Sequence, residues 1–482
     1  MLEGKVKKKL VAVVGKDRFL DTEEQRIVYS YDGTPGFQAE PDGIIRPAST
    51  KEIQEIVRIC AAHQIPIVPR GSGTNLCAGT TPTHGGLVML FSHMNQILEV
   101  DMNNLTMTVQ PGVTTLDIVY RAEEAGLFYP PDPSSMKIST IGGNINENSG
   151  GLRGLKYGVT KDYVMGIEFV LANGEAIRTG GKLAKDVAGY DLTKLMTGAE
   201  GTLGIITEAT LKLVPKPDKK ETMLALFPDM ESSARAVSSI IAAKIIPATL
   251  EFLDQPTLEV VEEFSQIGLP TSAGAVLLME QDGKSHLVSE DMEQMRVICE
   301  KEGAISVEKA QNEAESLALT EARRSALTAL ARRRPTTMLE DATVPRSRLA
   351  EMVRFIEATA KKYDVEICTF GHAGDGNLHP TCMTDVRDDE EMHRVEEAFA
   401  EIFSKAIDLG GTITGEHGVG EMKSPYLSWK LGEAGVDAMR AIKTALDPQN
   451  IMNPGKMFAK EARKRITVGG AASEEVKSTE SV

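Results

Sequence analysis

Two glycine-rich segments in the C-terminal half gather the residue types that hold metal ions. They are Gly371-His-Ala-Gly-Asp-Gly-Asn-Leu-His379 and Gly415-Glu-His-Gly-Val-Gly420, and they contain three of the eight histidines and two carboxylates. Imidazole nitrogens and carboxylate oxygens are ligands of divalent metals, and glycines let the backbone bring such ligands together. The glycines argue against a helix in the first segment, so we expect a strand end that runs into a tight loop, with the histidines in loops.

A simpler interpretation is that each segment is a turn with incidental histidines. For the first segment alone, the two interpretations are about equally supported. The second segment tips the balance, because Glu416 and His417 supply groups that the first one lacks. The pair of segments therefore predicts metal-assisted chemistry, and leaves open the substrate and any other cofactor.

Composition excludes several classes of partner. The chain has 482 residues and a formal net charge of -16, which argues against nucleic acid or an anionic membrane surface as the main partner. It has no run of 18 apolar residues, so no transmembrane segment is expected. Its five cysteines are scattered without a Cys-x-x-Cys pair, so the chain carries no iron–sulfur ligand set of its own. We expect a cytoplasmic protein with two or three domains.

Strands and helices alternate along the chain in the predicted secondary structure. In the N-terminal half, strands are predicted at 65–68, 106–109, 167–172, 176–179 and 205–214, and helices at 53–61 and 115–125. A Pro- and Lys-rich stretch at 215–220 looks like a linker, which predicts an N-terminal domain at 1–216 and a second domain at 217–458. In the second domain, helices are predicted at 229–243, 346–362, 389–409 and 433–446, and strands at 275–280 and 365–370. The polar segment 459–482 is expected to be a disordered tail.

Glycine-rich loops in the N-terminal half suit a polar, anionic cofactor. Pro69-Arg-Gly-Ser-Gly-Thr-Asn-Leu76 follows a predicted strand but cannot open a helix, so it is not a Rossmann loop. Successive backbone N–H groups there could still bind a pyrophosphate. A plain surface loop is the alternative. The segment from Thr140 to Gly151 is too polar and glycine-dense for a core element, and we expect a second loop there. The segment from Glu200 to Thr207 is also glycine-containing and precedes a predicted strand.

These motifs together resemble a known family. Arg70-Gly-Ser-Gly-Thr, Pro130-Pro-Asp-Pro, Ile141-Gly-Gly-Asn and Gly198-Ala-Glu-Gly-Thr-Leu-Gly-Ile stand in the order seen in FAD-linked oxidases of the vanillyl-alcohol-oxidase type. The two histidine segments and Asp447-Pro-Gln-Asn-Ile-Met-Asn-Pro-Gly-Lys456 are similar to the branch that contains the glycolate oxidase FAD subunit and D-lactate dehydrogenase. The resemblance covers roughly residues 20 to 458. Any one glycine loop is weak support, but the ordered set is strong.

The resemblance implies an α+β fold: a two-subdomain FAD-binding domain, followed by a C-terminal α+β cap domain with an antiparallel sheet. It implies non-covalent FAD, because Ser72 and Thr74 stand where some relatives carry a histidine that bonds to the flavin. The residues that it places around FAD are Arg70, Gly71, Ser72, Gly73, Thr74, Asn75, Leu76, Pro131, Asp132, Thr140, Gly142, Gly143, Asn144, Asn148, Gly150, Glu200, Gly204, Ile205, Ile206 and Asn453.

The resemblance also implies a chemistry, the oxidation of a 2-hydroxy acid. His372, His379 and Glu416 would hold a divalent metal (Zn, Fe or Mn) that polarises the substrate hydroxyl, and His417 would be the general base. Arg323 would bind the substrate carboxylate, with Arg324 as the close alternative. Both arginines could instead lie on a solvated helix face. Asp375 and Asn377 are expected to shape the loop or to support the ligands rather than to bind the metal.

Two further features refine the prediction of the substrate and of the electron acceptor. Relatives that act on bulkier diacids often have an asparagine two residues after the second histidine, whereas Pro380-Thr381 follows here. This favours a small acid such as glycolate or D-lactate. Electrons must leave the flavin, so we expect a partner, either an iron–sulfur subunit or an electron-transfer flavoprotein, in an oligomer or complex that could sit at the membrane periphery. A non-catalytic FAD subunit and a plain metal-dependent hydrolase are the rival classes.

Overall fold

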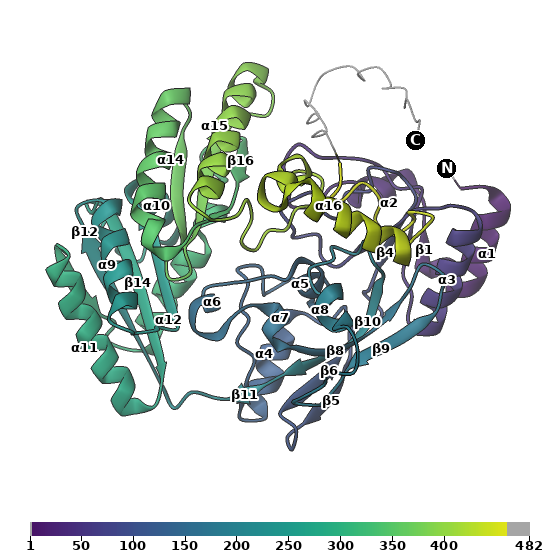
Figure 1. Cartoon of the computed structure of the whole chain (residues 1–482), viewed down its shortest axis with the longest axis horizontal. Helices are drawn as coiled ribbons and strands as arrows, with labels where there is room; N and C mark the ends of the chain where they lie inside the picture. Colours follow the sequence, from purple (N-terminus) through teal and green to yellow (C-terminus); the bar gives the residue numbers. More distant parts are fainter. Residues whose placement is uncertain (1, 460–482) are drawn as a thin grey trace.

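The computed structural model describes residues 2–459 and contains two small sheets and one large sheet, together with a short two-stranded sheet formed by 127–128 and 214–215 (Figure 1). The first two sheets belong to the N-terminal half, and the large sheet belongs to the second half. The final helix returns from the second half to the first. Apart from residue 459, the expected disordered tail at 459–482 lies outside the described residues.

The first sheet is built from the N-terminal segment and is covered by two helices. Its strand order is β1-β2-β4-β3; β2, β4 and β3 are parallel, and β1 pairs antiparallel with β2. Helices α1 and α3 pack on it through an apolar cluster that includes Val6, Leu10, Ile53 and Ile56. The elements are α1 (Gly4–Val14), β1 (Phe19–Leu20), α2 (Glu23–Val28), β2 (Gly43–Ile45), α3 (Thr50–Ala62), β3 (Ile67–Arg70) and β4 (Leu87–Leu90).

The second sheet is fully antiparallel, in the order β5-β6-β10-β8-β9. Its core joins the sheet to α4 and α5. The elements are β5 (Ile97–Asp101), β6 (Thr106–Val109), α4 (Thr115–Glu124), β7 (Leu127–Phe128), α5 (Ile141–Glu147), α6 (Gly154–Tyr157), α7 (Thr160–Tyr163), β8 (Val164–Val170), β9 (Ala176–Gly180), α8 (Leu192–Met196), β10 (Ile205–Lys212) and β11 (Val214–Pro215).

The large sheet of the second half is antiparallel, in the order β15-β12-β14-β13-β18-β19-β16, with β17 also paired to β19. Its strands are β12 (Lys219–Phe227), β13 (Thr249–Asp254), β14 (Ala275–Gly283), β15 (Ser306–Lys309), β16 (Thr336–Leu339), β17 (Ala342–Thr343), β18 (Ile367–His372) and β19 (Asn377–Thr384). Its helices are α9 (Met230–Ala242), α10 (Gln255–Ser265), α11 (Ser285–Lys301), α12 (Glu313–Arg324), α13 (Ala326–Leu330), α14 (Leu349–Tyr363), α15 (Asp389–Asp408) and α16 (Leu427–Leu446).

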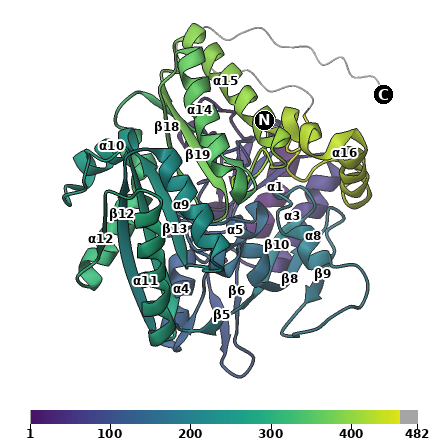
Figure 2. The same ribbon diagram turned by 60° about the vertical axis from the view of Figure 1, so that its left-hand side comes forward.

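The two faces of the large sheet have different roles, because side chains alternate along each strand. One face packs on α9, α11, α14 and α15 and forms the largest apolar core (Figure 2). The opposite face carries a smaller apolar cluster with α10 and α13, which includes Leu253 and Phe370. Glu251 alternates with Leu250 and Phe252 of the large core, so its side chain lies on this second face.

The C-terminal segment ties the second half to the first sheet. The N–H of Ile67 donates to the carbonyl of Ile451 (2.7 Å), and the N–H of Asn453 donates to the carbonyl of Ile67 (2.8 Å). The buried Lys443 amine donates to the carbonyls of Thr202 (2.8 Å) and Met452 (2.7 Å), and it pairs with Asp447 at 2.5 Å. The chain end is therefore held by buried polar contacts as well as by apolar packing.

Several expected elements are confirmed. β6 has the predicted bounds 106–109, α4 ends one residue before the predicted end, and β8 and β9 form the predicted hairpin around Asn173-Gly174. The strand expected at 205–214 ends at Lys212. The helix expected at 433–446 is the second part of α16, after the non-helical Gly432 (φ 68°), and the first part begins at Leu427.

Two expectations about local structure were wrong. The segment from Thr140 to Gly151 is not a loop throughout, because α5 occupies 141–147 and buries Ile141 and Ile145 in the core. His379 lies inside β19 and not in a loop. In both cases the glycines suggested loops, but tertiary packing and strand pairing decided the structure. The stretch at 215–220 connects the N-terminal half to the large sheet, although β11 includes Pro215 and β12 already begins at Lys219.

The buried Lys443 should be a main anchor of the chain end. Replacement by Met leaves the buried Asp447 carboxylate without its cation, and breaking such a pair costs about 3–5 kcal/mol. Chemical denaturation followed by the fluorescence of Trp429, the single tryptophan, on the same helix, measures the loss. The control is Arg440→Met, which removes a solvent-exposed pair with Asp437 and should cost at most about 1 kcal/mol. Equal losses in the two variants would contradict this role.

Candidate active site

A cavity of about 710 Å³ lies between the N-terminal half and the large sheet. Its volume is in the range of small-molecule and cofactor sites. One part is lined by the glycine loop 70–76 and by residues of α5, and the other part by histidines and arginines of the second half. The cavity therefore brings together the glycine-rich loop of the N-terminal half and the histidine segments of the second half.

The loop after β3 forms one wall by close approach of the backbone. Arg70 is buried and donates to the carbonyl of Tyr31 at 2.7 Å. A side chain at Gly71 would collide with Thr140, since a Cβ would lie 2.1 Å from its hydroxyl oxygen. Gly73 has φ +71° and lies against the Arg70 guanidinium. These positions require glycine, so the loop presents backbone rather than side chains to the cavity.

Helix α5 forms the neighbouring wall. Asn144 is buried and donates to the Thr115 hydroxyl at 2.6 Å. The helix ends at Asn148, which has φ 54° and accepts from the N–H of Lys161 at 2.9 Å. Beyond it, a Cβ at Gly150 would lie 2.5 Å from a carboxylate oxygen of Glu416. This end of the N-terminal half therefore packs directly on the predicted metal site.

The structure separates the residues predicted to surround FAD into two groups. Those that line the cavity are Arg70, Gly71, Ser72, Gly73, Thr74, Asn75, Leu76, Thr140, Gly143 and Asn144. Within the described residues, those that do not line it are Pro131, Asp132, Gly142, Asn148, Gly150, Glu200, Gly204, Ile205, Ile206 and Asn453. Several of the second group support the wall: Asn453 donates to the carbonyls of Gly79 (2.9 Å) and Glu200 (2.7 Å). Sequence reasoning missed Tyr31, Glu147 and Ser149, which also line the cavity.

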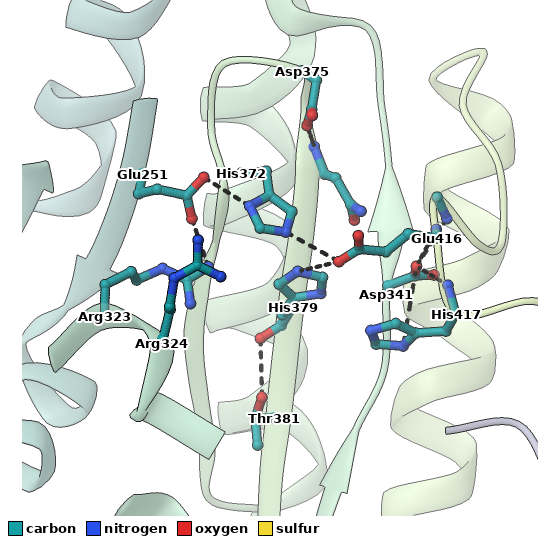
Figure 3. Close-up of polar contacts among 12 residues, drawn as sticks. Glu251, Arg323, Arg324, Asp341, His372, Asp375, His379, Thr381, Glu416 and His417 are labelled. Atoms are coloured by element: carbon teal, nitrogen blue, oxygen red, sulfur yellow. Dashed lines mark hydrogen bonds and ion pairs between the residues drawn. The ribbon is translucent and has the colours of Figure 1, made fainter. Parts of the chain in front are cut away.

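The three predicted metal ligands meet at one point (Figure 3). Nε2 of His372 lies 3.0 Å from Oε1 of Glu416, and Nε2 of His379 lies 3.4 Å from the same oxygen. His372 comes from the end of β18, His379 from β19, and Glu416 from the loop after α15. Such separations are those of two ligand atoms that share one ion through bonds of about 2.1 Å. The set of two imidazoles and one carboxylate fits Zn²⁺ or Fe²⁺.

Glu251 links this trio to Arg323. Its Oε1 lies 2.7 Å from Nδ1 of His372, and its Oε2 lies 2.6 Å from the Arg323 guanidinium. The first contact fixes a proton on Nδ1 and leaves Nε2 free as a metal ligand, as second carboxylates do for metal-bound histidines. Burial opposes the charge on His372, but Glu251 and Glu416 outweigh it and raise its pKa well above the ordinary value, so a metal ion at Nε2 would have to displace a proton.

Asp341 shapes the loop that carries Glu416 and His417. Its Oδ2 accepts from the backbone N–H groups of Gly415 (2.9 Å), Glu416 (2.8 Å) and His417 (3.1 Å). Its other oxygen accepts from the buried Lys423 amine at 3.0 Å. Burial disfavours the charge on Asp341, but the positive charge of Lys423, together with the backbone N–H of Glu416, outweighs it and holds its pKa well below the usual range. The carboxylate therefore stays ionised and fixes the loop.

His417 lies beside the metal trio and is neutral. Its ring stacks on that of His379, with 5.2 Å between the ring centroids. Burial lowers the pKa of His417 to about 4. The charge of Asp341, the nearest carboxylate, opposes this shift but does not outweigh it, because it lies 4.0 Å from Nδ1. That nitrogen is buried and makes no hydrogen bond within the described part of the chain. A neutral imidazole with an unused nitrogen can accept a proton.

Neither arginine of α12 lies on a solvated helix face. Arg323 is 3% exposed, packs over the Phe370 ring at 4.7 Å and pairs with Glu251. Arg324 pairs instead with Asp132, through bonds of 3.0 Å to its carbonyl and 2.5 Å to its carboxylate. Both arginines line the cavity, but Arg324 is engaged in holding the two halves together, whereas Nε of Arg323 is a buried donor that no described group accepts.

Sequence reasoning missed Glu251 and Asp341. A sequence signal for Glu251 exists, because it interrupts the apolar run Ala248-Thr-Leu-Glu-Phe-Leu253, and a carboxylate in a buried strand must have a partner. Asp341 follows an acidic neighbour at a strand end and carries no such signal. Its role depends on three N–H groups that lie more than seventy residues later in the chain.

Comparison with known proteins identifies the family. Residues 216–457 match the family model described as FAD linked oxidases, C-terminal domain, and residues 41–180 match the FAD binding domain. The chain is 68% identical, over 97% of its length and 99% of the relative, to the glycolate oxidase subunit GlcD of Bacillus subtilis (strain 168). It is 36% identical to the D-lactate dehydrogenase of Anaerostipes hadrus, over 88% of this chain and 90% of that one.

The chain belongs to the FAD-linked oxidase family. Its fold is that of a solved p-cresol methylhydroxylase with substrate bound, at a TM-score of 0.77, over 94% of this chain and 96% of that one, although the identity is 18%. The predicted fold class, a vanillyl-alcohol-oxidase-type FAD domain with a C-terminal α+β domain, is thus confirmed. The cavity fits FAD, because glycines that no other residue could replace open a backbone-lined groove at 70–76.

Glu251 should raise the metal affinity of the predicted site through its contact with His372. Glu251→Gln removes the charge that orients His372, and loss of such a supporting group lowers metal affinity about 10- to 100-fold. Titration of metal-free protein with Zn²⁺ or Mn²⁺ measures the affinity. Glu259→Gln, an exposed glutamate of α10, is the matched control and should bind as the wild type. An unchanged affinity in folded Glu251→Gln protein would reject this role.

Proposed function

We propose that the protein oxidises a small 2-hydroxy acid, such as glycolate or D-lactate, to the 2-oxo acid, with FAD as hydride acceptor and a divalent metal as activator. The observation that carries this proposal is that His379, Glu416, His417 and Arg323 line the cavity that the FAD loops also line, with His372 in contact with Glu416. The relatives named glycolate oxidase subunit and D-lactate dehydrogenase support the substrate class.

The substrate carboxylate would bind Arg323. A planar guanidinium matches a carboxylate, and Nε of Arg323 is a buried donor that needs an acceptor. Glu251 fixes the guanidinium from the other side through its 2.6 Å contact. Arg324 is a weaker choice, because its contacts to Asp132 already satisfy the group.

The substrate hydroxyl would lie between the metal ligands and His417. His417 would accept the hydroxyl proton on a ring nitrogen, which is possible because burial keeps the imidazole neutral. A divalent metal held by His372, His379 and Glu416 supplies a Lewis acid that makes this proton easier to remove. Bound FAD supplies the redox chemistry by accepting the hydride. Asp375 stays a supporting residue, since its carboxylate accepts from the N–H of Asn377 at 3.2 Å.

FAD would be dissociable, because Ser72 and Thr74 occupy the loop where a covalent link would need histidine. The electrons would pass to a partner protein, an iron–sulfur subunit or an electron-transfer flavoprotein, in keeping with the word subunit in the names of relatives. Among the described residues, no helix is long and apolar enough to cross a bilayer. A cytoplasmic location, an association with a complex and a domain boundary at residue 216 remain predictions.

A panel of D- and L-2-hydroxy acids tests the function directly. We expect anaerobic addition of glycolate or D-lactate to bleach the flavin absorbance of the purified protein. Acid precipitation should release the flavin into the supernatant. A yellow pellet would contradict non-covalent binding, and a flavin that no 2-hydroxy acid reduces would reject the proposed activity in favour of a non-catalytic FAD subunit.

The roles of His417 and Arg323 predict different defects. His417→Asn should slow flavin reduction by about 100- to 10,000-fold, the usual contribution of a general base, with little change in substrate affinity. Arg323→Met removes charge-assisted hydrogen bonds worth about 1.5–3 kcal/mol each, so the apparent Kd should rise about tenfold or more. Rapid-mixing anaerobic kinetics measures both quantities.

Arg324→Met is the matched control for the proposed binding of the substrate carboxylate by Arg323. It should leave substrate affinity less affected than Arg323→Met, since Arg324 is held by Asp132. Normal substrate binding by Arg323→Met together with weak binding by Arg324→Met would exchange the two assignments. A wild-type reduction rate in His417→Asn would show that the base lies elsewhere.

A further inference from the structure

One carboxyl group that the proposed reaction does not use lies in the wall of the large cavity. Glu147 is the last residue of α5 and lines the cavity together with the glycine loop 70–76. Its Oε2 accepts a hydrogen bond from the Cys77 thiol at 3.9 Å. A side chain at Gly418 would collide with the same oxygen, and a Cβ at Gly79 would lie 3.0 Å from Oε1. The two glycines therefore leave room for this carboxyl between two loops.

The surroundings of Glu147 favour its protonated form. Burial, followed by the negative charges of Glu200 and Asp32, raises the pKa of this carboxyl well above its ordinary value, and the hydrogen bond from Cys77 offsets only part of the rise. A carboxyl oxygen of Glu147 lies within 4.8 Å of one of Glu200. Two carboxyl groups so close do not both ionise readily, so the pair retains one proton.

Glu200 is the member of the pair that carries the negative charge. Its two oxygens accept from the N–H groups of Val419 and Gly420, each at 2.7 Å. Burial raises the pKa of Glu200, but these two bonds and the charge of Lys456 oppose the rise. Glu147 lacks such support, because the contact with the thiol is the one hydrogen bond that its carboxyl makes in the described chain. The proton therefore resides on Glu147, whose O–H group needs an acceptor.

The position of Glu147 indicates which part of FAD would be that acceptor. Gly418, against which the carboxyl packs, directly follows His417 in the chain, and His417 lines the same cavity. A flavin ring that receives a hydride from a substrate beside His417 must lie at this end of the cavity. The ring has carbonyl oxygens and ring nitrogens that accept hydrogen bonds, and such bonds tune its electronic properties.

We propose that the Glu147 carboxyl donates a hydrogen bond to the isoalloxazine ring of bound FAD and thereby raises its reduction potential. A hydride adds one negative charge to the ring, and a hydrogen bond to a charged acceptor is stronger than one to a neutral acceptor. The donor therefore stabilises the reduced ring more than the oxidised ring. The assignment to the ring rests on the proposed function, which places hydride transfer beside His417, whereas FAD binding rests on the family match.

The test compares Glu147→Ala and Glu147→Gln with the wild type, all loaded with FAD. The readout is the midpoint potential of the bound flavin, measured by anaerobic equilibration with a reference dye of known potential. Glu147→Ala should lower the ratio of the affinities for reduced and oxidised FAD about tenfold, which corresponds to about 30 mV for two electrons. Glu147→Gln keeps a neutral donor of similar size, so its potential should stay close to that of the wild type.

Glu55→Ala is the matched control, because Glu55 is an exposed residue of α3 that does not line the cavity in the described chain. Its potential should equal that of the wild type. An unchanged potential in folded, FAD-containing Glu147→Ala would overturn the inference, and so would a loss of FAD affinity without a shift in potential. A fall in Glu147→Gln as large as that in Glu147→Ala would overturn the role of a neutral donor. The expected shifts in a protein whose flavin no 2-hydroxy acid reduces would reject the proposed function and leave the contact with the ring intact.

Discussion

The buried carboxylate of Glu251 is the interaction on which the site depends. It is fully buried in the middle of a strand, and an isolated charge there would cost far more than the fold could offset. Its two oxygens face two different groups, His372 at 2.7 Å and Arg323 at 2.6 Å. The same charge therefore orients one metal ligand and holds the guanidinium proposed to bind the substrate. Substrate carboxylate and metal would thus be placed relative to each other by one rigid strand, β13.

The second organising constraint is the loop at 415–420, which both halves of the molecule hold. Asp341 of the second half accepts three of its N–H groups, and Glu200 of the N-terminal half accepts those of Val419 and Gly420, each at 2.7 Å. Gly150 leaves room for the Glu416 side chain, which a Cβ would displace. The position of Glu416 and His417 thus depends on correct docking of the two halves. Asp341, Glu200 and Gly150 therefore help to position this loop although they are distant from it in the sequence.

The sequence singled out side chains that the structure brings together, but it misjudged some of the elements that carry them. The residue types and spacing at 371–379 and 415–420 were enough to propose the three ligands, and the structure places their ligand atoms within 4.8 Å of one another. The same glycines misled the prediction of local structure. α5 contains two glycines and three polar residues in seven positions, yet it is helical because Ile141 and Ile145 fill the core. Glu251 and Asp341 escaped notice because their partners are 72 to 121 residues distant, and single-sequence patterns report only neighbours.

The net charge of the site indicates how many carboxylates a substrate could carry. Glu251 and Glu416 contribute two negative charges, and Arg323 contributes one positive charge. A divalent cation on the three ligands would displace the proton from Nε2 of His372 and leave one net positive charge, with His379 and His417 neutral, since burial lowers the pKa of both imidazoles. One substrate carboxylate neutralises that charge. A second carboxylate would exceed this balance. The charges of these groups therefore support the proposed monocarboxylate, whose one carboxylate would bind Arg323.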